Sequence, residues 1–448
     1  MAARLSTAAI LAAALITPQV YQNTPQLFCK PVPGSLDWPS VSDWQALNKS
    51  VAGRLLTPVP PGLVCQTNSS SHNIDACVGV LSQWTNSSWH AQDPFTADYN
   101  DESCLPDARA PCSAEGYPAY VVNATNVSHV QVAVKFAKRT GVRLIVKGTG
   151  HDFLGRSSGR DSFSIYTHNI RGVDVSMDNA CAKKHGGVAA VKIAAGMRMG
   201  EIYTEISKYN ITIVGGADPN VGIGGWSTGG GHSPISSKYG LGADQVLEME
   251  VVTADGTHLT INERSYPDLF WAMRGGGGST FAVLISVTVR AYPRLGVALY
   301  YFSYNTTANT DTFWSLLAYF HTAWANSPPE GVGLELRLGS RLLDREDLET
   351  DLQTLKQRLK QTTSGPHNTI IGHLVAGSGL KNVDIPGGGN SVLPAWRHAS
   401  APDVALLNNT AKLAVTDLLR DVEVEALRQL APNTGAYINE ADPAEPNW

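Results

Sequence analysis

Two glycine-rich segments constrain this chain more than any other feature of its sequence. Residues 215–231 hold eight glycines in 17 positions, and residues 275–278 are four glycines in a row. Glycine lets a backbone approach a ligand closely and turn its N–H groups towards an anion. Glycine-rich loops lose much conformational entropy on folding, so surface loops alone do not account for this density. The segments therefore indicate a site for a pyrophosphate-bearing dinucleotide, with plain surface loops as the alternative.

Three other interpretations of the motifs fit the sequence less well. Neither glycine-rich segment is a Walker A loop or a Gly-x-Gly-x-x-Gly turn between a strand and a helix, so an ordinary Rossmann domain is not supported. Gly225–Gly229 matches the Gly-x-Ser-x-Gly motif of hydrolases but lacks the preceding apolar strand. His232 and His258 lack a second ligand one helical turn away, so the sequence predicts no metal site.

The composition is that of a folded protein that binds a small molecule. With 448 residues the chain is long enough for two or three domains, and 43% hydrophobic and 16% charged residues are ordinary globular values. A net charge of -5 gives no reason to expect nucleic acid as a partner. The apolar run 5–16 is too short to span a membrane but follows a basic start. We therefore expect a signal peptide in residues 1–20, with a buried N-terminal helix as the alternative.

Sequons and cysteines also predict secretion. Asn-x-Ser/Thr sequons are glycosylated only in a secretory pathway. They begin at Asn48, Asn68, Asn86, Asn123, Asn126, Asn210, Asn305 and Asn408. The six cysteines match no zinc spacing, so disulfides formed in an oxidising compartment are the better interpretation, with 15 possible pairings. They are Cys29, Cys65, Cys77, Cys104, Cys112 and Cys181.

The order of the expected elements predicts an α+β fold. Apart from a helix around 44–55, residues 21–116 are rich in Pro, Ser, Asn and Cys and indicate a loop-rich region. From residue 117 strands and helices alternate. The expected strands are 120–122, 142–146, 163–167, 188–194, 211–214, 245–253, 257–261, 280–291, 298–304 and 333–338. The expected helices are 129–139, 199–209, 268–274, 312–325 and 346–361.

Four motifs in a fixed order carry a family resemblance. Ile145–Ser157 resembles a flavin-attachment loop, and Tyr437–Asp442 resembles a substrate-side strand near a C-terminus. Asp218–Gly225 with Ser237–Leu241, and then Leu269–Gly278, agree in order and spacing. Together the motifs resemble the vanillyl-alcohol oxidase/p-cresol methylhydroxylase superfamily, and most closely its berberine-bridge-enzyme-like oxidases of fungi. The resemblance covers roughly residues 117–448.

The resemblance implies that FAD is bonded to His151 through the 8α-methyl group of its ring. A neutral imidazole is a competent nucleophile towards that methyl group, whereas the alternative for His151 is a hydrogen-bonded core residue. Backbone N–H groups at the glycines would approach the phosphates, with Lys147 and Asp152 flanking them. The expected cofactor-binding residues are Lys147, Gly148, Thr149, Gly150, His151, Asp152, Asp218, Gly222, Gly224, Gly225, Gly229, Gly230, Gly231, His232 and Asn439.

Two departures from the family pattern shape the expected chemistry. Many relatives attach FAD a second time through a cysteine where this chain has Asp218, so attachment through His151 only is expected. Glu440 stands where many plant-type and sugar-oxidising relatives carry Tyr. A carboxylate beside an apolar flavin face can take a proton from the substrate. Glu440 and Tyr437 are therefore the catalytic candidates, with a solvated strand-end acid as the alternative for Glu440.

The sequence thus predicts a secreted FAD-dependent oxidoreductase that oxidises a small organic substrate by hydride transfer, with molecular oxygen reoxidising the flavin to give H2O2. A dehydrogenase of the same fold that uses another acceptor and an inactive secreted glycoprotein are the alternatives. The expected parts are a signal peptide (1–20), a disulfide-bearing region (21–116), a two-subdomain FAD-binding domain (117–295), a substrate domain (296–432) and the start of a shortened C-terminal segment (433–448). Neither the substrate nor the oligomeric state follows from the sequence.

Overall fold

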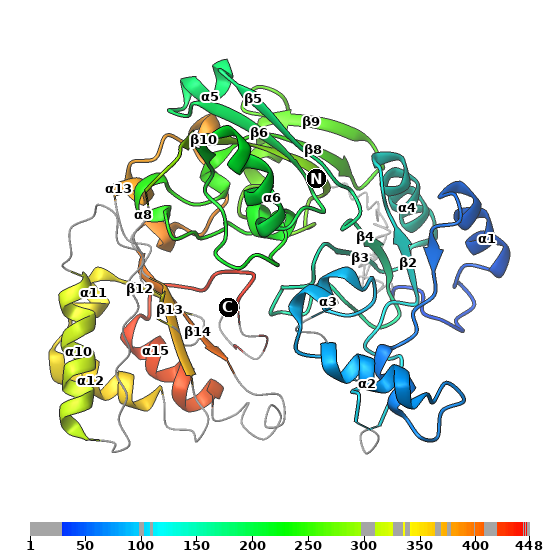
Figure 1. Ribbon diagram of the computed structural model, residues 1–448, viewed down its shortest axis with the longest axis horizontal. Helices are drawn as coiled ribbons and strands as arrows, with labels where there is room; N and C mark the ends of the chain where they lie inside the picture. Colours follow the sequence, from blue (N-terminus) through cyan, green and yellow to red (C-terminus); the bar gives the residue numbers. More distant parts are fainter. Residues whose placement is uncertain are drawn as a thin grey trace, which may run out of the picture. The chain divides into compact units, whose positions relative to one another are not determined.

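The computed structural model describes residues 29–97, 103–107, 111–296, 310–325, 335–336, 341–362, 369–373, 378–397, 399–406, 419–441, 443 and 445. Contacts divide the chain into two units, Met1–Lys30 and Pro31–Trp448, and the elements below belong to the second unit. The expected signal peptide and the expected strand 298–304 lie outside the described residues. Helices and three sheets together confirm the α+β fold class (Figure 1).

The first sheet carries the loop that holds His151. Its order is β1-β2-β4-β3, with β4 parallel to both of its neighbours and β1 antiparallel to β2. Between β2 and β3 runs α4 (Val127–Thr140), whose first turn is capped by the Asn126 side chain and which ends at Gly141, at φ +74°. Its apolar face packs against α1 (Val41–Ser50). The strands are β1 (Leu55–Leu56), β2 (Tyr120–Asn123), β3 (Leu144–Lys147) and β4 (Phe163–Tyr166).

The second sheet is antiparallel and supplies a large share of the core. Its order is β5-β6-β10-β8-β9, and β7 also pairs with β10. The long strand β10 lies between β6 and β8 and is almost entirely buried, as its continuous apolar run predicts. Gly256, at φ +81°, closes the hairpin between β8 and β9. The strands are β5 (Val173–Met177), β6 (Ala189–Ala194), β7 (Ile211–Thr212), β8 (Val246–Thr253), β9 (His258–Asn262) and β10 (Ala282–Pro293).

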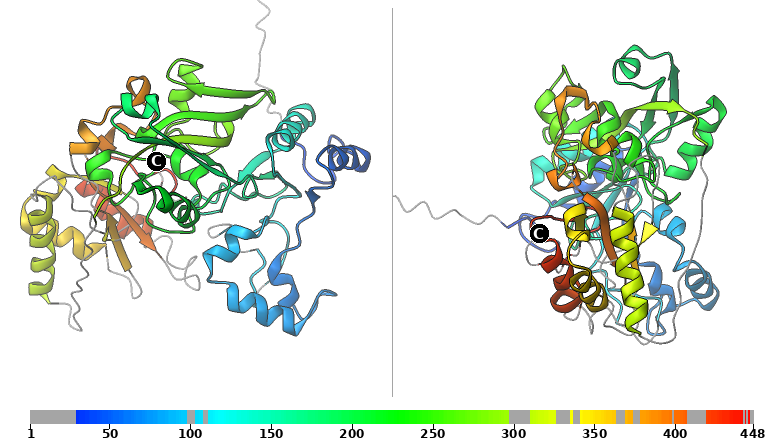
Figure 2. Two further views of the ribbon diagram at one scale, coloured as in Figure 1. Left: turned by 45° about the horizontal axis from the view of Figure 1, so that its top comes forward. Right: turned by 90° about the vertical axis from the view of Figure 1, so that its left-hand side faces the viewer.

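The third sheet is antiparallel, in the order β11-β13-β14-β12. Helices α10 (Asp311–Ala325), α12 (Leu352–Gln361) and α15 (Val424–Leu430) share an apolar core that includes Trp314 and Leu355. Figures 1 and 2 show α10 and α12 side by side, in agreement with their contacts. The strands are β11 (Glu335–Leu336), β12 (Arg341–Asp344), β13 (Thr369–His373) and β14 (Ala399–Leu406).

The expected helix 346–361 is wrong in one respect, because the structure has two helices there. The first, α11 (Arg345–Leu348), stops before Asp351, whose side chain caps α12 by accepting a hydrogen bond from Thr354 N at 2.9 Å. Between residues 180 and 381 the structure also describes the helices α5 (Ala180–Lys184), α6 (Met199–Ile206), α7 (Ile223–Thr228), α8 (Ser236–Tyr239), α9 (Pro267–Ala272) and α13 (Ser378–Lys381). Within the described ranges, none of the helices is long and apolar enough to cross a lipid bilayer.

The N-terminal region is more regular than the sequence indicates. It contains α2 (Ile74–Gln83) and α3 (Ser87–Gln92), each capped by an asparagine side chain at its start. Two disulfides form, Cys65–Cys77 and Cys104–Cys112. Cys29 and Cys181 are exposed free thiols, so the expectation that all six cysteines pair is wrong for these two.

Buried Lys147 joins the N-terminal region to the first sheet. Its ammonium group donates to the backbone carbonyl oxygens of Asp93 at 2.9 Å and His90 at 3.1 Å, and it lies 4.9 Å from the centre of the Tyr166 ring. Only 1% of Lys147 is exposed, and a buried charge is tolerated when its donors are satisfied. The end of β3, where the loop with His151 begins, is therefore fixed against the residues around α3.

Candidate active site

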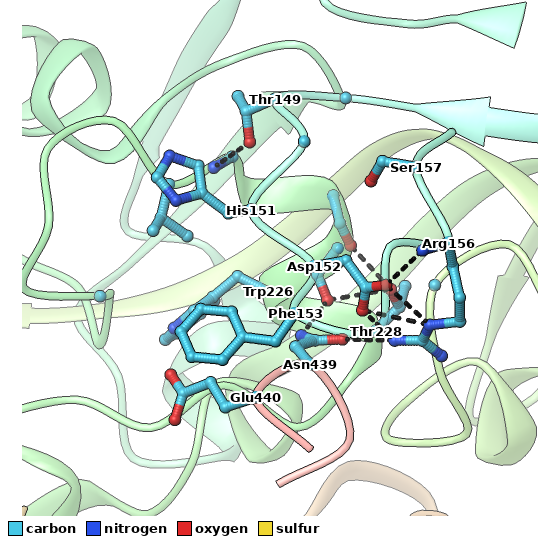
Figure 3. A pocket seen from close by; sticks show the side chains of 18 of the residues that line it. Thr149, His151, Asp152, Phe153, Arg156, Ser157, Trp226, Thr228, Asn439 and Glu440 are labelled. Atoms are coloured by element: carbon cyan, nitrogen blue, oxygen red, sulfur yellow. Dashed lines mark hydrogen bonds and ion pairs between the residues drawn. The ribbon is translucent and has the colours of Figure 1, made fainter. Parts of the chain in front are cut away.

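Three segments far apart in sequence line one cavity of about 450 Å³. They are the loop after β3 (148–157), the glycine-rich segment that contains α7 (216–232) and the turn 437–440 (Figure 3). Leu284 of β10 adds an apolar side chain to the wall. Small-molecule sites typically measure about 300 to 1,000 Å³, so this cavity has the size of a ligand site.

The loop that carries His151 is held on both sides of that residue. Thr149 Oγ1 accepts a hydrogen bond from Gly222 N at 3.2 Å, which ties the loop to the glycine-rich segment. The Asp152 carboxylate accepts hydrogen bonds from the guanidinium of Arg156 and from the backbone N of Arg156. The second bond measures 2.7 Å. Figure 3 shows the His151 ring pointing away from this ion pair. The imidazole is thus presented to the cavity while its neighbours are fixed.

The glycines leave space beside the backbone where a cofactor needs it. A Cβ atom at Gly225 would meet nothing within 4 Å, and one at Gly148 would meet only Thr167 Oγ1 at 3.9 Å. Gly150 has φ +94°, a conformation that other residues rarely adopt, and a Cβ there would lie 3.0 Å from Ala97. Backbone without side chains suits close approach to a dinucleotide, and an apolar wall suits a flavin ring. The residues present therefore fit a flavin dinucleotide.

The second glycine-rich segment packs against the first. The backbone N–H groups of Gly275 and Gly277 both donate to Thr228 O, at 2.9 and 3.1 Å. Both glycines have positive φ, +122° and +98°, which other side chains would oppose. These two N–H groups are used within the protein and are not available to an anion, whereas Gly278 of the same segment lines the cavity.

The segment 437–440 is a turn, and the expectation of a strand there is wrong. Glu440 N donates to Tyr437 O at 2.9 Å, which folds the segment back on itself. Asn439 Nδ2 donates to the Tyr437 hydroxyl at 2.7 Å. Burial raises the pKa of Tyr437, and the Glu440 charge raises it further. The phenol therefore stays protonated and can act only as a hydrogen-bond partner.

Glu440 forms a close pair with His232 on the cavity wall. His232 Nε2 lies 2.9 Å from Glu440 Oε1, and the two side chains are only 14% and 20% exposed. A carboxylate and an imidazole at this distance can share or pass a proton. The candidate base predicted from sequence is thus paired with a second titratable group.

Most of the expected site residues line this cavity. They are Gly148, Thr149, Gly150, His151, Asp152, Asp218, Gly222, Gly224, Gly225, His232, Tyr437, Asn439 and Glu440. Lys147 lies instead beneath α3. Three of the expected glycines pack inside the protein and do not line the cavity: Gly229, Gly230 and Gly231. A Cβ at Gly229 would collide with Asn439, and one at Gly231 would lie 2.7 Å from Trp226.

Sequence reasoning missed three residues that shape the site. Arg156 pairs with Asp152 and also donates to Asn439 Oδ1 at 3.2 Å, and its four-residue spacing from Asp152 was the available signal. Phe153 and Trp226 line the cavity with aromatic surface. Trp226 lies on α7, a helix that the glycine content hides because glycine disfavours helices. In the part of the chain described, no group of three or more His, Cys, Asp or Glu side chains could hold a metal ion.

Comparisons with known proteins identify the family. Residues 118–262 match the family described as FAD binding domain. An FAD-linked oxidoreductase of Arthroderma benhamiae is 31% identical across 94% of this chain and 88% of that protein. The chain belongs to the vanillyl-alcohol oxidase/p-cresol methylhydroxylase superfamily. The resemblance to this superfamily that the motifs indicate is confirmed.

Two further relatives define how far the similarity extends. The VAO-type flavoprotein oxidase VAO615 of Thermothelomyces thermophilus is 41% identical over 303 residues, which are 65% of this chain and 52% of that protein. The crystal structure of MtVAO615 from Myceliophthora thermophila C1 has a TM-score of 0.82 at 27% identity and covers 94% of this chain and 91% of that one. This chain spans about half the length of the first curated relatives that it matches.

Proposed function

We propose that this protein is an FAD-dependent oxidase that carries FAD on His151 and removes a hydride and a proton from a small alcohol or amine. The observation that carries the proposal is the placement of His151 and the Glu440–His232 pair on the wall of one cavity. An oxidation of this kind needs a hydride acceptor facing the substrate carbon and a proton acceptor facing the hydroxyl or amine group on that carbon. The cavity offers a place for the first and a side chain for the second.

The cofactor's attachment is proposed to be single. The loop around His151 and the open backbone at Gly148 and Gly225 would hold FAD, which supplies a two-electron acceptor when bound. Asp218 lines the cavity at the position where many relatives carry the second attachment residue, and its Oδ1 accepts from Asn220 N at 2.7 Å. A carboxylate cannot form that second thioether bond, so the proposal assigns the covalent bond to His151 alone.

Glu440 is proposed as the base. A carbon releases a hydride readily only as its hydroxyl or amine loses a proton, so a proton acceptor beside the flavin speeds the step. The phenol of Tyr437 stays protonated and cannot serve, because burial raises its pKa. Glu440 borders the same cavity as Phe153 and Trp226, and its side chain is only 20% exposed. The hydroxyl proton would go to Glu440 while the hydride goes to the flavin.

Molecular oxygen is proposed as the electron acceptor, with H2O2 as the second product. Support comes from VAO615, which is named a flavoprotein oxidase and is 41% identical over the part that matches.

The parts of the chain assigned from sequence are retained in the proposal: an FAD-binding domain in 117–295, a substrate domain in 296–432 and a C-terminal segment from 433.

Secretion is the remaining element of the proposal. The disulfides Cys65–Cys77 and Cys104–Cys112 require an oxidising compartment. Among the sequon asparagines of the described residues, Asn68, Asn86, Asn126 and Asn210 are exposed, as N-glycosylation requires. Asn86 and Asn126 also cap α3 and α4 with their side chains, whereas neither Asn68 nor Asn210 lies at the start of a helix. Together with the expected signal peptide in residues 1–20, these features support an extracellular flavoprotein.

The first prediction concerns attachment. His151→Ala should abolish flavin that survives acid precipitation, because the alanine side chain has no nitrogen to form the bond. The measurement is flavin fluorescence of the denatured protein on a gel. His258→Ala, at an exposed position away from the cavity, is the matched control and should keep its bound flavin. Acid-stable flavin in the His151→Ala variant would show that another residue forms the bond.

The second prediction concerns the base. Glu440→Gln keeps the shape of the side chain but cannot accept a proton, so flavin reduction should slow at least about tenfold. This lower limit is cautious, because general-base assistance usually contributes about a hundred- to ten-thousand-fold in rate. The measurement is anaerobic stopped-flow absorbance with an alcohol chosen by a peroxide-release screen. Glu115→Gln, an exposed surface carboxylate, is the control and should react as the wild type does. An unchanged rate and pH profile in Glu440→Gln would contradict the assignment. Reduction of a dye without peroxide would favour a dehydrogenase.

The third prediction concerns the secretory pathway. Peptide mass spectrometry should find N-glycans on Asn68 and Asn210, since both are exposed. Asn123 should be unmodified, because it is half-buried and its Oδ1 accepts a hydrogen bond from Asn169 Nδ2 at 2.7 Å. Asn68→Gln should lose the corresponding glycan and nothing else. Secreted protein with no glycan on Asn68 or Asn210, or with a glycan on Asn123, would contradict this account of the surface.

A further inference from the structure

His232 occupies a defined position between two aromatic rings. Its ring stacks on Trp396 at a centroid distance of 6.1 Å and an interplanar angle of 18°, and it meets the Tyr437 ring edge-on at 5.2 Å and 81°. Both aromatic side chains are almost fully buried, at 2% and 3% exposure. The main-chain oxygen of His232 also accepts a hydrogen bond from Trp226 Nε1 at 3.1 Å. The ring is therefore restricted, with Nε2 directed at Glu440.

This geometry addresses a physical difficulty for a buried base. A carboxylate surrounded by apolar groups tends to take up a proton from solvent, and a protonated carboxyl cannot accept one from a substrate. A hydrogen bond from an imidazole to one carboxylate oxygen favours the ionised form. The 2.9 Å contact between His232 Nε2 and Glu440 Oε1 provides such a bond. It also fixes which way the carboxylate faces.

Other charged and titratable groups that line the same cavity lie on three segments, and on the glycine-rich segment that carries His232 this group is Asp218. Tyr437 lies on the same turn as Glu440, and its pKa is raised by burial and further by the Glu440 charge. On the attachment loop lie His151, Asp152 and Arg156, and the last two neutralise each other in an ion pair. The structure thus gives Asp152 a partner of its own, and His232 Nε2 lies within hydrogen-bond distance of Glu440 Oε1.

We propose that His232 is the positioning residue of the base: it holds Glu440 ionised and aimed so that the carboxylate accepts the substrate's hydroxyl or amine proton. The proposal rests on the proposed function. In the step, the substrate carbon loses a hydride, with its two electrons, to the flavin, and the proton passes to Glu440. A C=O or C=N bond forms, and the proton later returns to solvent. His232 exchanges no electrons and acts only through Glu440.

The first test compares pH profiles of flavin reduction with the alcohol from the peroxide-release screen. His232→Phe removes the hydrogen bond and should lower the rate of flavin reduction about tenfold at neutral pH. The loss is smaller than the full general-base contribution because Glu440 is still present. The acidic limb should move up by about one pH unit, the size expected from losing a hydrogen bond to a charged group. His232→Gln keeps a donor at the equivalent position and should recover most of the rate. A uniform loss at every pH in His232→Phe would show a merely structural role and overturn the proposal.

A double variant tests whether His232 acts through Glu440. If it does, adding His232→Phe to Glu440→Gln should cost less than about twofold more, because residues that work through one group are not additive. A full additional loss in the double variant would overturn the proposal.

A second readout does not depend on activity. Histidine-ring NMR of the flavin-loaded full chain, with His232 assigned from the resonance missing in His232→Gln, follows its titration directly. In Glu440→Gln this resonance should titrate at lower pH than in the wild type, because the stabilising negative charge is gone. The resonance of exposed His258 should not move. An unchanged His232 titration overturns the inference whatever the rates are. A shifted titration with wild-type flavin reduction in Glu440→Gln shows instead that the proposed base is wrong, and the positioning role falls with it.

Discussion

The Asn439 side chain joins the three segments on which the rest of the site depends. Its Nδ2 donates to Gly225 O at 3.0 Å and to the Tyr437 hydroxyl at 2.7 Å, while its Oδ1 accepts from Arg156 at 3.2 Å. Its main-chain oxygen accepts from Phe153 N at 2.8 Å. The loop with His151, the glycine-rich segment and the turn with Glu440 are thereby fixed to one another. The proposed oxidation needs a hydride acceptor at the substrate carbon and a proton acceptor at the oxygen or nitrogen bonded to it, and the Asn439 amide fixes the segments that would carry the two.

Local sequence was enough to predict the residues that lie close together in the chain. The loop from Gly148 to Asp152 and the turn from Tyr437 to Glu440 were found from their motifs, and all of them line the cavity apart from Ile438. Pairings between distant segments could not be predicted, because they depend on how the sheets pack. His232 and Glu440 are 208 residues apart and meet only through the fold. The turn at 437–440 was also missed, because the strand expected there was carried over from the family resemblance, whereas the hydrogen bond from Glu440 N to Tyr437 O folds the segment back.

The glycines show a second limit of sequence reasoning. Their density marked segments that line the cavity, but it could not separate cavity glycines from packing glycines. Gly225 faces open space, whereas Gly231 lies under the Trp226 ring and Gly275 donates to Thr228 O. Lining a cavity and packing against a neighbouring segment both require a residue without a side chain, so both appear in the sequence as glycine. Lys147 likewise stands beside the glycines of the attachment loop, yet its ammonium group anchors the chain around α3.

The central claim, that Asn439 couples the three segments into one site, is tested most directly by hydrogen–deuterium exchange of Asn439→Ala. The account predicts faster exchange in three sets of peptides at once: 148–157, 222–231 and 437–441. Asn169→Ala, which removes a hydrogen bond to Asn123 outside the cavity, should leave all three unchanged. If exchange in Asn439→Ala rises only in residues 437–441, the segments are held by other contacts and the claim is contradicted.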